Sequence, residues 1–159
     1  MITGESGAGK TMTADYIMKM LVYLGRAPNR NIEDKILQIH PVLEAFGNAQ
    51  TALNDNSSRF AKFVDLSFSK IGKVTGARVS VYLLEHTRVV DKHDKEDKNF
   101  HIFNMMISGL EKQNRLEEFK LEKGKKYKIV GDSNIDNATG SSFEKLMNGF
   151  KLIGFRDAD

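Results

Sequence analysis

The chain has 159 residues, of which 40% are hydrophobic and 28% are charged, as is usual for a single soluble globular domain. Its lysines are interspersed with acidic residues and its formal net charge is only +3, so it lacks the basic stripe of a nucleic-acid-binding protein. It contains no cysteine, which excludes disulfides and thiol chemistry. No apolar run is long enough to span a membrane and no signal-peptide pattern opens the chain, so we expect a cytoplasmic protein without a transmembrane segment.

The first motif, GESGAGKT, occupies Gly4 to Thr11 and matches the phosphate-loop pattern G-x-x-x-x-G-K-[ST] at every fixed position. Its glycines permit left-handed backbone conformations and close approach of a ligand, so that consecutive N–H groups can point at phosphate oxygens. Lys10 would place a positive charge on the β- and γ-phosphates, and the Thr11 hydroxyl would be a ligand of Mg²⁺. The predicted nucleotide-binding residues are Gly4, Glu5, Ser6, Gly7, Ala8, Gly9, Lys10 and Thr11. The alternative is a glycine-rich turn that binds no ligand.

Only three residues precede this loop, whereas a phosphate loop normally follows a buried strand. We therefore expect the chain to be a piece of a longer protein, truncated at both ends.

Two helices are predicted in the first third of the chain. The first extends from Lys10 to about Leu24 and ends at the segment Gly25 to Asn31. Asn31 is a candidate N-cap for the second helix, which Pro41 should kink or restart. The apolar positions of the first helix are Tyr16, Met20, Tyr23 and Leu24, flanked by Ile17 and Leu21. Those of the second are Ile36, Leu37, Ile39, Val42, Leu43 and Phe46.

A hairpin is predicted next, with strands at residues 59–68 and 73–84 and a turn at Ser69 to Gly72. In its second strand, Val79, Val81 and Leu83 alternate with Arg78, Ser80 and Tyr82.

Four further segments and the histidines complete the chain. Residues 91–98 have the mixed charge of a solvated loop, and residues 99–110 predict a helix. Residues 121–132 fit a short basic hairpin or a loop, and a final helix should open at Ser141 or Ser142. The histidines show no metal-ligand spacing; they are His40, His86, His93 and His101.

A second polar motif, NDNSSRFAKF, occupies Asn54 to Phe63. It places two amides, two hydroxyls and an arginine between the second helix and the hairpin. We expect it to form a loop that faces the phosphate site.

Taken together, these motifs resemble the myosin motor head, whose phosphate loop reads GESGAGKT and whose first switch reads N-x-N-S-S-R-F-G-K. The resemblance extends from Ile2 to about Phe155 and includes IEDKILQIHPVLEAFGNAQ, VYLLEHTRVV and DKNFHIF. It implies an α/β fold: part of a P-loop NTPase motor domain, with helices and part of a mixed twisted sheet. The domain would be partial, with the phosphate loop at residues 4–11, a short first surface loop at 25–31 and the first switch at 54–62.

The resemblance also implies roles for individual residues. Asn54 would contact the nucleotide phosphates, and Thr11 and Ser58 would hold Mg²⁺. Ser57, near the attacking water, Arg59 and Lys10 would be the catalytic residues of an ATPase. In this family Arg59 would pair with a glutamate of a second switch, which is not in this sequence, so we expect Arg59 to be without its partner and the isolated segment to be inactive.

The cofactors implied are ATP and Mg²⁺. The partners implied are actin filaments and light chains or calmodulin, all through regions outside this chain, in a cytoskeleton-associated cytoplasmic setting. Because strands that would flank the phosphate loop are missing, both early helices should expose apolar faces.

Three features depart from the family pattern. Met12 replaces a glutamate, which removes a favourable acid from a helix N-terminus. Ala61 replaces a glycine, which would be strained by about 1 kcal/mol if its φ were positive and nearly silent otherwise. The short segment 25–31 favours an unconventional myosin class.

Other functions remain open from the sequence. One is a non-motile fragment or splice product that binds nucleotide weakly or not at all. A compact P-loop kinase or small GTPase is disfavoured, because there is no guanine-specifying N-K-x-D motif and no arginine cluster of a lid. Kinesins share the S-S-R motif but differ after its arginine.

Overall fold

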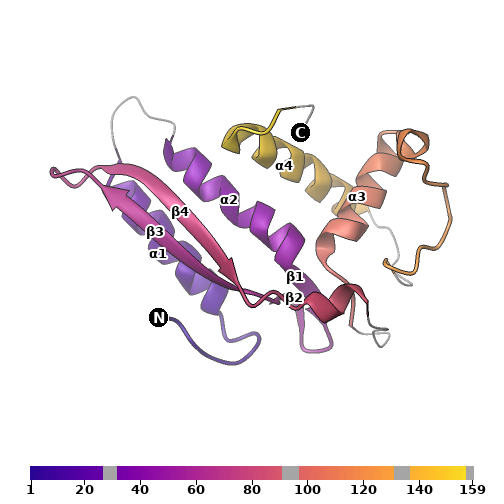
Figure 1. Ribbon diagram of the computed structural model, residues 1–159, viewed down its shortest axis with the longest axis horizontal. Helices are drawn as coiled ribbons and strands as arrows, with labels where there is room; N and C mark the ends of the chain where they lie inside the picture. The colour runs from indigo at the N-terminus through magenta and orange to yellow at the C-terminus, as the bar shows by residue number, and fades with distance from the viewer. Residues whose placement is uncertain (27–31, 91–96, 131–136, 157–159) are drawn as a thin grey trace.

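The computed structural model describes residues 1–26, 32–90, 97–130 and 137–156 (Figure 1). Of these, residues 137–141 are described by their backbone alone. Within the described residues there are four α-helices and two antiparallel strand pairs, one short and one long. The helices are α1 (Lys10–Leu24), α2 (Ile32–Gly47), α3 (His101–Lys112) and α4 (Asn137–Ile153). The strands are β1 (Asn48–Thr51), β2 (Asn54–Ser58), β3 (Ala61–Phe68) and β4 (Val74–Tyr82), and the 3₁₀ helices are η1 (His86–Val89) and η2 (Leu116–Phe119).

The first helix has the predicted bounds. It begins after Gly9, whose φ of 83° is left-handed, and ends at Gly25, whose N–H donates to the Leu21 carbonyl at 2.9 Å. Its buried face is formed by Met18 and Val22, which pack with Ile36 of α2 and Val74 of β4. The six apolar positions named from the sequence are instead 40–74% exposed. The contacts of α1 with α2 and with the β3–β4 hairpin bury one narrow face of the helix.

The second helix is longer and more regular than predicted. It continues through Pro41 and does not restart there. Pro41 is exposed, so water can replace the backbone hydrogen bond that a proline cannot donate. The proposed N-cap, Asn31, lies outside the described residues.

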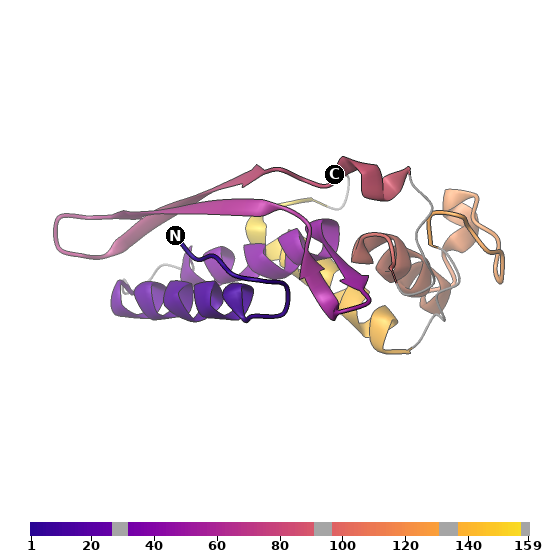
Figure 2. The same ribbon diagram turned by 90° about the horizontal axis from the view of Figure 1, so that it is seen from below.

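The long hairpin β3–β4 is confirmed. Ala61 pairs with Tyr82 and Leu66 with Ala77 in an antiparallel ladder, and Gly72, with φ 75°, occupies the turn. The strand ends at Tyr82 because Leu83 takes a φ of 54°, which breaks the predicted alternation. Figure 2 shows this hairpin extending along α1, with the N-terminal loop bending toward β2.

One prediction about the strands is wrong. Residues 54–58 form a strand, β2, and not a loop, because β1 supplies an antiparallel partner with Asn48 opposite Ser58. In the described part of the chain the strands form two antiparallel pairs, β1 with β2 and β3 with β4. Polar side chains had favoured a loop at β2, but backbone pairing with the preceding segment overrides that preference.

The C-terminal half is mainly helical. Helix α3 agrees with the predicted segment, and α4 packs against both α2 and α3 (Figure 1). Helix α4 begins at Asn137, four residues before Ser141, the earlier of the two predicted starts. Residues 121–130 form turns without a strand, so of the two predicted structures the loop is the one found.

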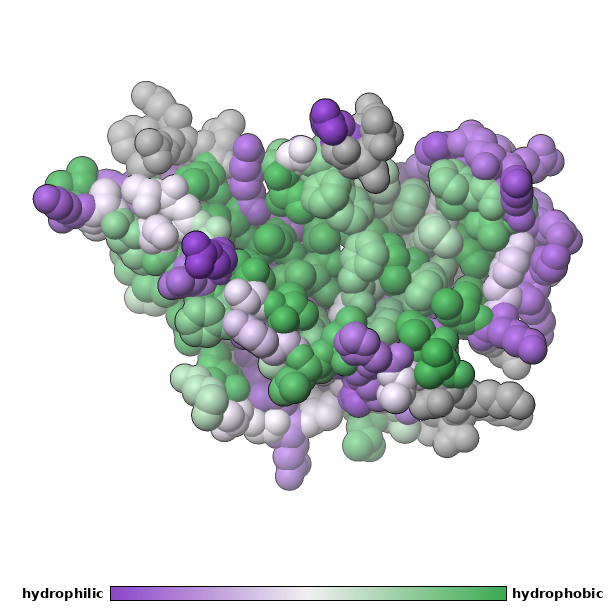
Figure 3. All heavy atoms as spheres, in the orientation of Figure 1, coloured by the Kyte–Doolittle hydropathy of each residue, from purple (hydrophilic) through white to green (hydrophobic). Residues whose placement is uncertain are grey.

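Apolar side chains remain exposed over much of the surface. Figure 3 shows hydrophobic residues across the middle of one face, with hydrophilic residues gathered at one side. The exposed residues of the hairpin and its exit include Phe63, Tyr82 and Leu83. Exposed apolar surface of this kind is typical of sites that contact other protein. No helix in the described ranges is long and apolar enough to cross a membrane.

The contact between α3 and α4 gives a testable consequence. A β-carbon at Gly109 would lie 2.1 Å from a ring carbon of Phe143 and 2.6 Å from its Cβ, so Gly109→Ala should lower the free energy of unfolding by about 1–3 kcal/mol. Gly149→Ala is the matched control, because its nearest neighbour would be Val42 at 3.4 Å, an ordinary contact. Alanine favours a helix by up to about 1 kcal/mol over glycine, so Gly149→Ala should be neutral or stabilising. Urea unfolding followed by circular dichroism measures both; equal stabilities would contradict this packing.

Candidate functional site

The predicted phosphate loop has the backbone that anion binding requires. Gly7 and Gly9 have φ values of 79° and 83°. A β-carbon at either position would have no neighbour within 4 Å, so glycine is needed here for its conformation and not for space. The loop leads directly into the N-terminus of α1, where free N–H groups and the helix dipole favour a negative ligand.

Contacts within the loop fix its shape. The Ala8 N–H donates to the Glu5 carbonyl at 3.3 Å, and the Lys10 ammonium donates to the same carbonyl. The Thr13 hydroxyl donates to the Gly9 carbonyl at 3.0 Å, at the start of the helix. Lys10 therefore lies folded along the loop, within reach of an anion bound by the loop amides.

Strand β2 brings two hydroxyls to this loop from about fifty residues away. Ser57 Oγ lies 3.4 Å from Ser6 Oγ, and Ser58 Oγ lies 3.2 Å from Thr11 Oγ1. Ser57 is buried, whereas the Thr11 and Ser58 pair is exposed. The two motifs that the sequence analysis singled out are thus neighbours in space.

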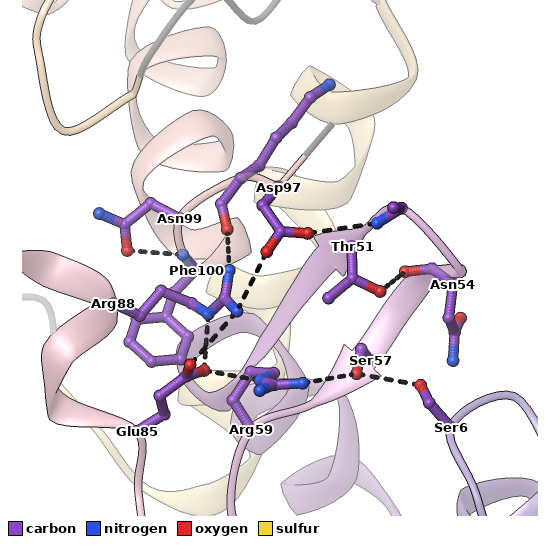
Figure 4. A network of polar contacts seen from close by, with 12 residues as sticks. Ser6, Thr51, Asn54, Ser57, Arg59, Glu85, Arg88, Asp97, Asn99 and Phe100 are labelled. Carbon is purple, nitrogen blue, oxygen red and sulfur yellow. Dashed lines mark hydrogen bonds and ion pairs between the residues drawn. The ribbon is translucent and has the colours of Figure 1, made fainter. Parts of the chain in front are cut away.

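Arg59 extends the site to η1 (Figure 4). Its Nη1 donates to Ser57 Oγ at 3.2 Å and its Nε donates to Glu85 Oε2 at 2.6 Å. In place of the second-switch glutamate, which is not in this sequence, Arg59 pairs with Glu85, 26 residues further along the chain.

Arg88 holds the other side of Glu85. Arg88 is only 3% exposed; its Nε donates to Glu85 Oε2 at 2.7 Å and its Nη1 donates to the Lys98 carbonyl at 2.7 Å. Asp97 lies 4.0 Å from Arg88 and accepts from the Ala52 N–H in the β1–β2 turn at 3.2 Å. Burial raises the pKa of Glu85, but the hydrogen bonds from Arg59 and Arg88 outweigh it and hold that pKa below its ordinary value. Glu85 is therefore ionised at neutral pH.

Unlike Ser57 and Ser58, Asn54 is not brought to the loop by the contacts of the described residues. It lies at the start of β2, whereas Ser57 and Ser58 lie at its end. Its carbonyl accepts from the Thr51 hydroxyl at 3.2 Å and its Oδ1 accepts from the Asn56 N–H at 2.9 Å. Both contacts lie within the β1–β2 hairpin.

Asn56 joins four elements and was not predicted as a site residue. Its Oδ1 accepts from Asn48 Nδ2 at 2.9 Å and lies 3.0 Å from His101 Nε2, and its Nδ2 lies 3.5 Å from Glu44 Oε1. Burial lowers the pKa of His101, so this imidazole is neutral at neutral pH. The amide thereby ties β2 to α2, β1 and α3.

Glu85 and Arg88 were also missed as site residues. The signal in the sequence was a pair of opposite charges three residues apart, directly after the apolar strand segment VYLL. Within the described ranges no group of three His, Cys, Asp or Glu residues could hold a metal ion.

Comparison with known proteins identifies the family. Residues 1–159 match the family model described as myosin head (motor domain). The chain belongs to the myosin head family. It is 44% identical over 167 residues to Myosin-IIIb of Mus musculus, with 100% of this chain and 13% of that protein covered.

Other myosins show similar identity. The chain is 41% identical over 163 residues to Myosin-IIIa of Homo sapiens, covering 98% of this chain and 10% of that protein. It is 40% identical over 173 residues to Myosin-1 of Saccharomyces cerevisiae, covering 98% of this chain and 9% of that protein. The chain thus spans about a tenth of the length of the myosins it matches.

Two departures from the myosin pattern can now be placed. Ala61 begins β3 and is not among the residues with positive φ, so its replacement of a glycine is nearly silent. Met12 is 55% exposed in the first turn of α1, which contains no acidic residue. Most of the short surface loop, residues 27–31, lies outside the described part of the chain.

Proposed function

We propose that this chain is the nucleotide-binding segment of an actin-based, ATP-driven myosin motor. The observation that carries the proposal is the pairing of the phosphate loop with β2 through Ser6 and Ser57 and through Thr11 and Ser58. The loop amides and Lys10 would bind the β- and γ-phosphates, and Asn54 would contact phosphate only after leaving its present contacts within the hairpin.

The hydroxyls of Thr11 and Ser58 fit a magnesium ion. Two neighbouring ligands of an octahedral Mg²⁺ at 2.0–2.1 Å are about 2.9 Å apart, close to the 3.2 Å between these oxygens. When bound, Mg²⁺ would neutralise charge on the β- and γ-phosphates. Two hydroxyls and no carboxylate suit an ion that takes its remaining ligands from phosphate and water.

The remaining residues would act on the γ-phosphate. In hydrolysis a water oxygen forms a bond to the γ-phosphorus, the bond to the β–γ bridging oxygen breaks, and ADP and phosphate result. Ser57 would position the water, and Arg59 would hold Ser57 and place positive charge near the reacting group. Actin filaments and light chains or calmodulin would bind other parts of the motor, in a cytoskeletal setting.

A second candidate concerns the 159 residues by themselves. Tyr16, Met20 and Tyr23 of α1 are 61–74% exposed. This unburied face favours weak or no nucleotide binding and no turnover by the segment in isolation, with activity present only in the full head.

The magnesium assignment can be tested by the Mg²⁺ dependence of nucleotide binding in a full-length motor head that contains this segment. Thr11→Ala and Ser58→Ala should each raise the Mg²⁺ concentration for half-maximal binding by at least about ten-fold, because each removes one ligand. Thr75→Ala, at an exposed position on β4, is the control and should leave it unchanged. Unchanged Mg²⁺ dependence in both site variants would exclude this ion site.

A further inference from the structure

We propose that Glu85 is a positioning residue: it holds Arg59, and through Arg59 the hydroxyl of Ser57, beside the phosphate loop. The inference rests on the proposed nucleotide-binding function and adds to it a carboxylate outside both motifs. Figure 4 shows the continuous line of contacts from Arg88 through Glu85, Arg59 and Ser57 to Ser6.

Glu85 is held by side-chain and backbone contacts. Its Oε2 accepts from Arg59 Nε at 2.6 Å and from Arg88 Nε at 2.7 Å, and its Oε1 lies 3.4 Å from Arg88 Nη2. Its own N–H donates to the Arg59 carbonyl at 3.0 Å, and its carbonyl accepts from the Arg88 N–H at 3.2 Å. Glu85 and Arg59 are therefore joined twice, which limits how far either can turn.

Arg88 provides the fixed end of this line. A guanidinium that is 3% exposed and bound to the Lys98 carbonyl cannot exchange its partners for water freely. Charge-assisted hydrogen bonds of this kind are stronger and more directional than neutral ones. The negative charge that faces Arg59 is thus held in place by a buried cation.

The other end of the line determines how the Ser57 hydroxyl is used. A guanidinium has only donors, so Ser57 Oγ must accept from Arg59 Nη1 and its own proton points elsewhere. Ser6 Oγ lies 3.4 Å away in the phosphate loop, and either of these two oxygens could donate to the other. By holding Arg59, Glu85 fixes one acceptor position of Ser57 and so limits the directions in which Ser57 can donate to a water or phosphate oxygen.

A comparison within the chain shows what an ordinary ion pair looks like. Arg115 and Glu118 lie 2.9 Å apart, and their side chains are 46% and 56% exposed. The Arg115–Glu118 pair is surrounded by solvent, whereas Arg59 of the Arg59–Glu85 pair also donates to Ser57, a buried serine beside the phosphate loop. Glu118→Gln is accordingly the matched control.

The test is a double-mutant cycle on ATP turnover in a full-length motor head containing this segment. Glu85→Gln should lower kcat by about ten-fold or more with the nucleotide dissociation constant changed less than about three-fold, because the effect arises in the chemical step. Glu118→Gln should leave kcat unchanged. Combined with Ser57→Ala, Glu85→Gln should add almost nothing to the loss caused by Ser57→Ala alone, because both changes remove the same oriented hydroxyl.

Three outcomes are decisive. If the losses of the two variants multiply, Glu85 does not act through Ser57 and the inference fails. If Glu85→Gln does not fold, the same cycle with Glu85→Asp, which keeps the charge but shortens its reach to Arg59, decides in its place. If the unmodified head binds no Mg-nucleotide, the proposed function itself fails. If the head binds nucleotide in a manner that depends on Lys10, but the kcat losses of Glu85→Gln and Ser57→Ala multiply, only the inference about Glu85 is overturned.

Discussion

Lys10→Ala is expected to weaken binding of a fluorescent ATP analogue by about 100-fold or more, because it removes the positive side chain of the loop that would compensate the charge of the phosphates. Lys10 lies against the Glu5 carbonyl at the base of the phosphate loop. The loop amides would remain, but amides without the ammonium give the phosphates much weaker charge compensation. A fluorescence titration of a full-length head with this segment measures the dissociation constant.

The control for Lys10→Ala is another lysine with little structural role. The side chain of Lys123 is 79% exposed and its Nζ lies 3.7 Å from Glu111 Oε1, so Lys123→Ala should bind the analogue normally. If the Lys10→Ala and Lys123→Ala variants bind the ATP analogue with the same affinity, residues 4–11 form a glycine-rich turn that does not bind phosphate.

Arg59→Ala is expected to reduce ATP turnover by about 10²–10³-fold while nucleotide binding persists, the range seen when one group that stabilises transition-state charge is removed. Arg59 orients Ser57 but makes no described contact with the loop residues that would bind phosphate. Its loss should therefore appear in kcat and not in the dissociation constant. Single-turnover measurement separates the two quantities.

The same substitution should also cost stability. Arg59→Ala leaves Glu85 with Arg88 as its side-chain partner and removes the guanidinium that donates to Ser57. We therefore expect the free energy of unfolding to fall by about 1–2 kcal/mol. This value is smaller than for a fully buried pair because the side chain of Arg59 is 30% exposed and its charge is partly screened by water. Arg115→Ala, which breaks an exposed pair with Glu118, should change neither turnover nor stability by much. Equal turnover by the Arg59→Ala and Arg115→Ala variants would remove Arg59 from the site.

Local features of the fold were predictable from the sequence. The glycines of GESGAGKT and the apolar spacing behind them predicted the loop and α1, because backbone freedom and helix periodicity are local properties. The β3–β4 hairpin followed from two β-prone segments around a turn. Helix α4 was predicted with the wrong start, since Asn137, Thr139 and Gly140 are weak helix formers and their propensity alone does not indicate a helix there.

Features that depend on distant partners were not predictable in the same way. Asn54 to Ser58 has the composition of a loop, yet it is a strand because β1 lies beside it. Arg59 finds Glu85, and Asn56 finds His101, across separations of 26 and 45 residues. A composition or a spacing does not specify such pairs; they arise only when the elements pack.

Hydrogen–deuterium exchange with and without Mg-nucleotide tests most directly whether residues 4–11 and 54–58 form one site. With a full-length head containing this segment, the account predicts that a non-hydrolysable ATP analogue with Mg²⁺ slows exchange in both segments together. It also predicts that chelating Mg²⁺ releases most of the protection at 54–58, because the contact there runs through Ser58. Protection of neither segment, or of residues 4–11 alone, would contradict a shared nucleotide site.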